Sequence, residues 1–184
     1  MDDATLSAAR LALVGFGVEN RALGRYLAAR GLRFAVCDAN PACRNDGEPL
    51  DASVTEWRLG GDCFAHLDDF TVLFRSPGIP VRHPDLQTAR RTGVELSSQT
   101  ALFLDRCPAS VLAVTGTKGK GTTASLVASI LQRAALPFRL GGNIGIPPVT
   151  FLDELTAATV VVLELSSFQL QGLGRSPHGA VVLP

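Results

Sequence analysis

The stretch VLAVTGTKGKGTT, residues 111–123, decides how this sequence is interpreted. Its apolar, β-rich start at 111–114 breaks at Gly116, and helical spacing begins at Thr122. That helix is predicted to place one apolar face inward, made of Leu126, Val127, Ile130 and Leu131. A strand, a glycine loop with lysines and a helix together predict a polyphosphate site. Glycines let backbone N–H groups close on phosphate oxygens, while the helix start and a lysine add positive charge.

The spacing of this loop departs from the general Walker form, which has four residues between its two glycines. Here Gly116 and Gly119 enclose only two residues. Gly121 stands where a serine or threonine would hold Mg²⁺, and Thr122 is the nearest hydroxyl. The alternative, a glycine-rich turn with incidental lysines, leaves the paired lysines without a purpose. We therefore interpret the loop as a phosphate site.

Composition excludes several classes of function. Seventeen Lys and Arg balance seventeen Asp and Glu among 184 residues, so no basic field suggests nucleic acid. No apolar run is long enough for a bilayer, and the acidic start at Asp2 is unlike a leader peptide. We expect a cytoplasmic protein. The four cysteines have no metal-site spacing, and Cys37 and Cys107 are expected to be reduced core thiols.

The first part of the chain has the dinucleotide-binding layout. A strand at 10–14 runs into GFGVEN at 15–20, a helix at 21–30 and a second strand at 34–37. Asp38 follows about where an acid belongs in that layout. Asn20 replaces the third glycine, so a tight turn in any doubly wound sheet is an equal alternative.

The following pattern continues the alternation of strands and helices. A strand at 72–74 stops at Ser76-Pro77-Gly78, which places free backbone N–H groups at the carboxyl end of a sheet. A helix at 84–91, a strand at 94–96 and a helix at 99–106 come next. Because the residue before Pro108 avoids the helical region, we predict a domain boundary there. The predicted domains are residues 1–106 and 107–184.

Beyond the phosphate loop, a strand at 138–140 ends in GGNIG at 141–145. The three glycines predict a backbone that passes close to another group, with Asn143 as a hydrogen-bonding tip; a plain glycine-rich turn ahead of Pro147-Pro148 is the alternative. A fully apolar run at 159–163 predicts a strand buried on both faces and delivers Glu164 to its carboxyl end. An acid there can hold Mg²⁺ or its water shell; a carboxylate capping the next turn is the alternative. The last predicted strand begins at 180, so we expect the sequence to stop inside this domain.

Alternating strands and helices predict an α/β fold throughout, with mainly parallel sheets. The motifs resemble the Mur ligase family, whose phosphate loop reads Gly-Thr-Asn-Gly-Lys followed by Ser or Thr, with Lys118 in the place of the asparagine. Their order resembles the branch that joins D-glutamate to UDP-N-acetylmuramoyl-L-alanine. LELSSFQL at 163–170 and GGNIG at 141–145 are its most specific motifs. The resemblance implies a Rossmann-like first domain and an incomplete P-loop-type ATPase domain.

The resemblance also implies site residues and ligands. The ligands would be ATP, Mg²⁺, UDP-N-acetylmuramoyl-L-alanine and D-glutamate, used through an acyl phosphate. Lys120 and Glu164 would be catalytic, and Thr122 and Glu164 would hold the metal. ATP would contact Gly116, Thr117, Lys118, Gly119, Lys120, Gly121, Thr122 and Thr123. The UDP precursor would contact Gly15, Phe16, Gly17, Val18, Glu19, Asp38, Ser76, Pro77, Gly78, Asn143, Ser167 and Gln169.

Two other functions remain open at this point. A non-catalytic module that binds a nucleotide or UDP-sugar would need only residues 15–38. A ligase similar to folylpolyglutamate synthetase is favoured by Gly121-Thr122, although that branch has no domain before its phosphate loop. We expect a monomer. We also expect the 184-residue chain to bind the UDP precursor weakly and to form no amide bond by itself.

Overall fold

The computed structural model describes residues 1–45, 50–143 and 145–184. Within these ranges the chain forms two compact units, Met1–Gln99 and Thr100–Pro184. The division falls seven residues before the predicted boundary at 106/107. The helix ahead of Pro108 packs into the second unit, where the Phe103 ring meets the edge of Phe151 at 5.9 Å between centroids. Ile144 of the predicted GGNIG segment lies outside the described residues.

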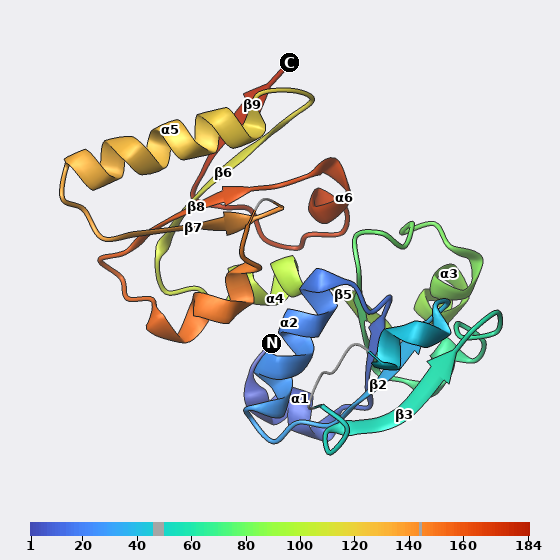
Figure 1. Cartoon of the computed structure of the whole chain (residues 1–184). Coiled ribbons are helices and arrows are strands. Elements are labelled where there is room, and N and C mark those ends of the chain that lie inside the picture. The colour runs from blue at the N-terminus through green and yellow to red at the C-terminus, as the bar shows by residue number, and fades with distance from the viewer. Residues whose placement is uncertain (46–49, 144) are drawn as a thin grey trace. The chain divides into compact units, whose positions relative to one another are not determined.

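The first unit is built on a parallel sheet with helices in its connections (Figure 1). Its elements are α1 (Asp3–Ala8), β1 (Leu11–Val14), α2 (Val18–Ala28), β2 (Phe34–Asp38), η1 (Pro41–Asn45), β3 (Val54–Leu59), η2 (Leu67–Asp69), β4 (Val72–Arg75), α3 (Pro84–Arg91) and β5 (Glu95–Ser97). The strand order in the described residues is β3-β2-β1-β4-β5. The predicted Rossmann-like arrangement is confirmed, and α1 is an addition that the sequence analysis missed.

The strand order places the switch point of the sheet between β1 and β4. From β1 the chain winds outward through β2 and β3, then returns to add β4 on the other side. Val14 pairs with Arg75 in this register, so the glycine turn after β1 and the Ser-Pro-Gly turn after β4 leave the sheet side by side. Ligands of open α/β sheets bind in this kind of crevice. Both strands are fully buried, as their apolar composition predicts.

The second unit holds another parallel sheet, ordered β7-β8-β6-β9 within the described ranges. Its elements are α4 (Gln99–Arg106), β6 (Ser110–Gly116), α5 (Lys120–Arg133), β7 (Phe138–Gly142), η3 (Pro148–Glu154), β8 (Val160–Glu164), α6 (Ser167–Leu170) and β9 (Gly179–Leu183). Strand β8 lies between β6 and β7, which explains its continuous apolar sequence. The predicted α/β class is therefore confirmed in both units.

Helix α5 packs on this sheet through a narrower face than predicted (Figure 1). Val127 and Leu131 contact the core, together with the buried Ala124. Leu126 and Ile130, predicted to point inward, are 60% and 57% exposed. Leu126 and Ile130 each precede one of the inward-facing residues Val127 and Leu131, and the helical turn of about 100° per residue carries them off the contact face. None of the helices in the described ranges has both the length and the apolar character needed to cross a bilayer.

The cysteines are buried thiols, as the sequence analysis expected for two of them. Cys37, Cys43, Cys63 and Cys107 are all buried and outside disulfide bonds. Burial raises the pKa of the Cys37 thiol to about 12, so this group stays protonated near neutral pH.

Candidate nucleotide and phosphate sites

The predicted site residues fall into two groups, one at the carboxyl edge of each sheet. In the first unit, Gly15 has φ +79° and packs against the turn that follows β4. A Cβ atom at Gly15 would lie 2.9 Å from Ile79 Cγ1 and 2.9 Å from Ser76 Cβ. The glycine turn and the Ser-Pro-Gly turn are therefore brought into contact, and only glycine fits between them.

The Asp38 carboxylate accepts hydrogen bonds from two backbone N–H groups of the first unit. Its Oδ2 accepts a hydrogen bond from the Phe16 N–H, and its Oδ1 accepts one from the Asn40 N–H at 2.7 Å. The carboxylate thus joins the glycine turn to the loop after β2. The role of Asp38 in ligand binding stays a prediction, but its structural role is clear from these two bonds.

Asn20, which replaces the third fingerprint glycine, has a bracing role that sequence reasoning did not assign. The side chain is 0% exposed. Its Nδ2 donates to the carbonyl oxygens of Gly15 at 2.7 Å, Phe74 at 2.9 Å and Val14 at 3.3 Å. One amide therefore fixes the carboxyl ends of both β1 and β4. Its position in the GFGVEN motif was the available signal.

In the second unit, the predicted phosphate loop joins β6 directly to α5. Gly116 has φ +137°, and a Cβ atom there would lie 2.3 Å from the Leu183 carbonyl oxygen. Gly119 has φ +79° and precedes the helix without a side-chain cap. The helix begins at Lys120, two residues earlier than predicted. The N–H groups of its first turn therefore have no intrahelical partner and point toward the loop.

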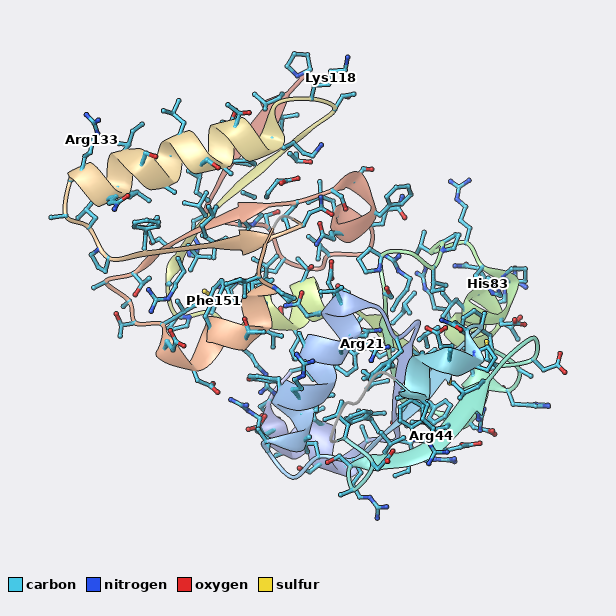
Figure 2. All side chains as sticks on the ribbon, viewed as in Figure 1. Arg21, Arg44, His83, Lys118, Arg133 and Phe151 are labelled. Carbon is cyan, nitrogen blue, oxygen red and sulfur yellow. The ribbon has the colours of Figure 1, made fainter. Side chains whose placement is uncertain are left out.

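The two lysines of this loop behave differently. Lys120 Nζ donates to the Gly116 carbonyl at 2.9 Å and to the Thr117 carbonyl at 3.2 Å, so its charge lies within the loop. Lys118 is exposed and extends from the outer end of the loop (Figure 2). Thr122 is exposed in the first turn of α5. A phosphate group on this loop would have two cations and a helix start within reach.

Glu164 is the buried carboxylate next to this loop. It ends β8, in register with Val114 of β6 and Gly142 of β7, and is 3% exposed. Its Oε1 accepts a hydrogen bond from Asn143 Nδ2 at 3.2 Å, whereas its Oε2 has no hydrogen-bond partner among the residues that the structure describes. A buried anionic oxygen without a partner is costly, so this oxygen suits a bound cation.

The approach of β7 to β8 depends on a glycine. Gly142 has φ +110°, and a Cβ atom there would lie 2.2 Å from the Glu164 carbonyl oxygen. The Asn143 N–H donates to that same carbonyl at 2.8 Å. The glycine-rich segment thus positions both the backbone and the carboxylate of Glu164, as its three glycines suggested.

The two residues predicted after Glu164 have different environments. Ser167 is exposed, whereas Gln169 is 2% exposed. Gln169 Oε1 accepts from the Ser166 N–H at 2.8 Å, and Ser166 Oγ accepts from the Gln169 N–H at 3.3 Å. This is a capping box at the start of α6. Contact of either residue with substrate stays a prediction.

The side chains around Glu164 suit a metal ion shared with a ligand better than one held by protein alone. Within the described ranges no cluster of three or more His, Cys, Asp or Glu side chains could hold an ion. Mg²⁺ keeps several waters and commonly takes one or two carboxylates plus substrate phosphates. The open Oε2 of Glu164 beside a phosphate loop therefore fits Mg²⁺ bound together with a nucleotide, and does not fit an all-protein metal cage.

Comparison with known families settles the relationship. The family described as "Mur ligase MurD-like, N-terminal domain" matches residues 9–98. The family described as "Mur ligase middle domain" matches residues 114–183. The chain belongs to the Mur ligase family. Mur ligases are ATP-dependent ligases of peptidoglycan synthesis that generally need Mg²⁺.

Two curated relatives of this chain are both named UDP-N-acetylmuramoylalanine--D-glutamate ligase. The UDP-N-acetylmuramoylalanine--D-glutamate ligase of Symbiobacterium thermophilum is 44% identical over 180 residues, covering 94% of this chain and 38% of the relative. The ligase of the same name from Ruminiclostridium cellulolyticum is 37% identical over 175 residues, with the same two coverages. The chain therefore spans 38% of the length of these relatives.

Solved Mur ligase structures share the fold. UDP-N-acetylmuramate:L-alanyl-gamma-D-glutamyl-meso-diaminopimelate ligase from Neisseria meningitides matches with a TM-score of 0.51 and 22% identity, covering 95% of this chain and 60% of that one. UDP-N-acetylmuramate-alanine ligase MurC from Thermotoga maritima matches with a TM-score of 0.50 and 19% identity, covering 95% and 41%. At these identities the likeness concerns the fold alone.

Proposed function

We propose that this chain provides the precursor-binding and ATP-binding regions of a ligase that joins D-glutamate to UDP-N-acetylmuramoyl-L-alanine. The observation that carries the proposal is the pairing of β6 with β8. Their carboxyl ends place the Lys120 loop next to Glu164 and its open Oε2. The names of the relatives at 44% and 37% identity support this choice of substrates.

The proposed division of labour follows the two units. The turns at 15–19 and 76–78 of the first unit would receive the UDP end of the precursor, because they flank the switch point of the sheet. The second unit would receive ATP on the loop at 116–123. Asn143 and Ser167 would meet the muramoyl-alanine portion. This proposal includes a monomeric protein in the cytoplasm, which size-exclusion chromatography and cell fractionation would test.

The chemistry assigns a role to each charged group. The carboxylate of the precursor attacks the γ-phosphorus of ATP, and ADP leaves. The amine of D-glutamate then attacks the acyl phosphate, and inorganic phosphate leaves. Lys120 and the start of α5 offset the negative charge on the transferred phosphoryl group. Glu164 and Thr122 would hold Mg²⁺, which supplies further charge neutralisation there.

The proposal is tested by ligand-induced stabilisation of this chain. Thermal unfolding is measured with UDP-N-acetylmuramoyl-L-alanine, with Mg·ATP and with NADH in parallel. A ligand present at about 100 times its dissociation constant should add roughly 2.7 kcal/mol. We expect shifts with the first two ligands. Lys120→Met is the matched control, since it should remove the ATP shift and keep the precursor shift. A shift with NADH alone would overturn the proposal in favour of a dinucleotide module.

A further inference from the structure

Arg75 is a buried cation whose role the proposed function does not explain. It ends β4 and is 2% exposed, immediately before the Ser76-Pro77-Gly78 turn. Arginine is rarely buried to this extent unless it is held by specific partners. Burial lowers the pKa of this guanidinium, because the charged group has lost most of its contact with water.

The guanidinium spans the turn that borders the candidate nucleotide site. Arg75 Nη1 donates to the Ile79 carbonyl at 2.7 Å and to the Ser76 carbonyl at 3.3 Å. The Ile79 N–H also donates to the Ser76 carbonyl, at 3.0 Å. One side chain therefore ties together both ends of the turn, and the same two residues contact Gly15. The position of this turn sets the shape of the glycine turn beside it.

Arg75 also acts on the charge of the first helix turn. Glu19 lies in the first turn of α2, and its carboxylate favours the charged form of Arg75. An acid at a helix start is favourable by itself. The Glu19 carboxylate also repels a second anion at the same helix end, where a diphosphate would bind. The positive charge of the buried Arg75 would weaken this repulsion.

We propose that Arg75 is a positioning residue for diphosphate binding in the first unit: it fixes the Ser76–Ile79 turn against Gly15. The ligand would be a nucleoside diphosphate, recognised through backbone N–H groups rather than by contact with Arg75. This inference rests on the proposed function, because that function takes a UDP-linked precursor as the ligand.

The experiment compares ligands that differ only in the diphosphate. Binding of uridine and of UDP to the 184-residue chain is measured by NMR titration for the wild type, Arg75→Met and Arg75→Lys. We expect Arg75→Met to weaken UDP binding about tenfold or more, which corresponds to about 1.4 kcal/mol, and uridine binding less than about twofold, because only the diphosphate depends on the turn that Arg75 holds. Arg75→Lys keeps the charge and should recover most of the UDP affinity.

Two further measurements separate positioning from general stability. Hydrogen exchange of the Ile79 amide without ligand should accelerate in Arg75→Met, because the turn loses its anchor. Adding Glu19→Gln to Arg75→Met should recover part of the UDP affinity if charge offset matters. Unchanged exchange together with unchanged UDP affinity would overturn the proposal, and so would equal losses for uridine and UDP.

A failure of the proposed function would look different. If the wild type binds neither UDP nor the UDP precursor, the diphosphate assignment falls with that function. Faster Ile79 exchange in Arg75→Met would still establish that Arg75 holds the turn. Unchanged exchange in that case would overturn both statements.

Discussion

The two glycine turns of this chain follow the same pattern of strand, glycine turn and helix, yet they are held in opposite ways. In the first turn, the Asn20 amide nitrogen and the Asp38 carboxylate hydrogen-bond to the backbone of the turn, while Asn20 Oδ1 has no partner among the described residues. In the second turn, Lys120 rests on loop carbonyls and Glu164 keeps an open oxygen. The first turn is preorganised by its own side chains. The second keeps charged groups that a ligand can recruit.

This difference matches what each turn would bind. A diphosphate recognised by backbone N–H groups needs a rigid loop, because each misplaced donor weakens binding. A triphosphate with Mg²⁺ brings its own charges, so it needs side-chain cations and an acid that can exchange partners. Substitutions at Asn20, Gly142, the two loop lysines and the two carboxylates should therefore affect the two turns differently.

Asn20→Leu should produce the largest effect. It removes the donor that the carbonyl oxygens of Gly15, Phe74 and Val14 share, although the Val14 carbonyl keeps the Ser76 N–H as a donor. The loss of this donor from the other two carbonyls costs about 1–3 kcal/mol each, so we expect a loss of about 3 kcal/mol or more in unfolding free energy. Urea unfolding followed by the fluorescence of Trp57, the one tryptophan of the sequence, measures the first unit. Gly17→Ala is the control: its Cβ would lie 3.7 Å from Ser76 Oγ, an ordinary contact. It should cost at most about 1 kcal/mol. Equal effects would mean that Asn20 is not a brace.

Gly142→Ala should disturb the second turn through Glu164. Its Cβ would collide with the Glu164 carbonyl at a positive φ, so about 2 kcal/mol or more of stability should be lost. Gly145→Ala provides the matched control, because Gly145 also has positive φ, +80°, but has no atom within 4 Å of its Cβ position. It should cost about 1 kcal/mol, from backbone strain alone. Urea unfolding followed by circular dichroism compares the two, and indistinguishable losses would remove the argument for close packing.

Lys120→Met tests whether the second turn relies on a recruited cation. A hydrogen bond to a charged group contributes about 1.5–3 kcal/mol, so ATP affinity should fall about 10- to 150-fold. Lys118 is exposed, and an exposed charge contributes about 0–1 kcal/mol, so Lys118→Met should weaken ATP about fivefold at most. Isothermal titration of both variants with Mg·ATP measures the difference. A larger loss for Lys118→Met would assign the main phosphate contact to the outer lysine.

How far the sequence predicted these features depends on how local their causes are. The strands, the glycine turns and the acid at the end of β8 follow from short-range pattern, and the structure has them. The role of Asn20 was not predicted, because the Phe74 carbonyl that it binds is 54 positions away in the chain. Arg75 binds carbonyls only one and four positions away, but its burial depends on the packing of the sheet, which short-range pattern does not give. The prediction that Leu126 of α5 faces the sheet was wrong, since helical spacing does not tell which of two neighbouring apolar positions lies nearer the sheet.

The smallest expected effects concern Asp38 and Glu164, because removing the negative charge should destabilise the chain at Asp38 and stabilise it at Glu164. Asp38 uses both oxygens on backbone N–H groups, so Asp38→Asn should lose about 1 kcal/mol or more of stability. Glu164 has a buried oxygen without a hydrogen-bond partner in the described part of the chain, so Glu164→Gln should relieve a desolvated charge and stabilise the ligand-free chain by about 1 kcal/mol. The same change should abolish any tightening of ATP binding by Mg²⁺. Thermal unfolding of both variants shows whether each is more or less stable than the wild type. Titration with ATP, with and without Mg²⁺, shows how far ATP affinity depends on the metal. Destabilisation by Glu164→Gln with intact Mg²⁺ dependence would mean that Glu164 is a structural acid like Asp38, and the contrast between the two turns would disappear.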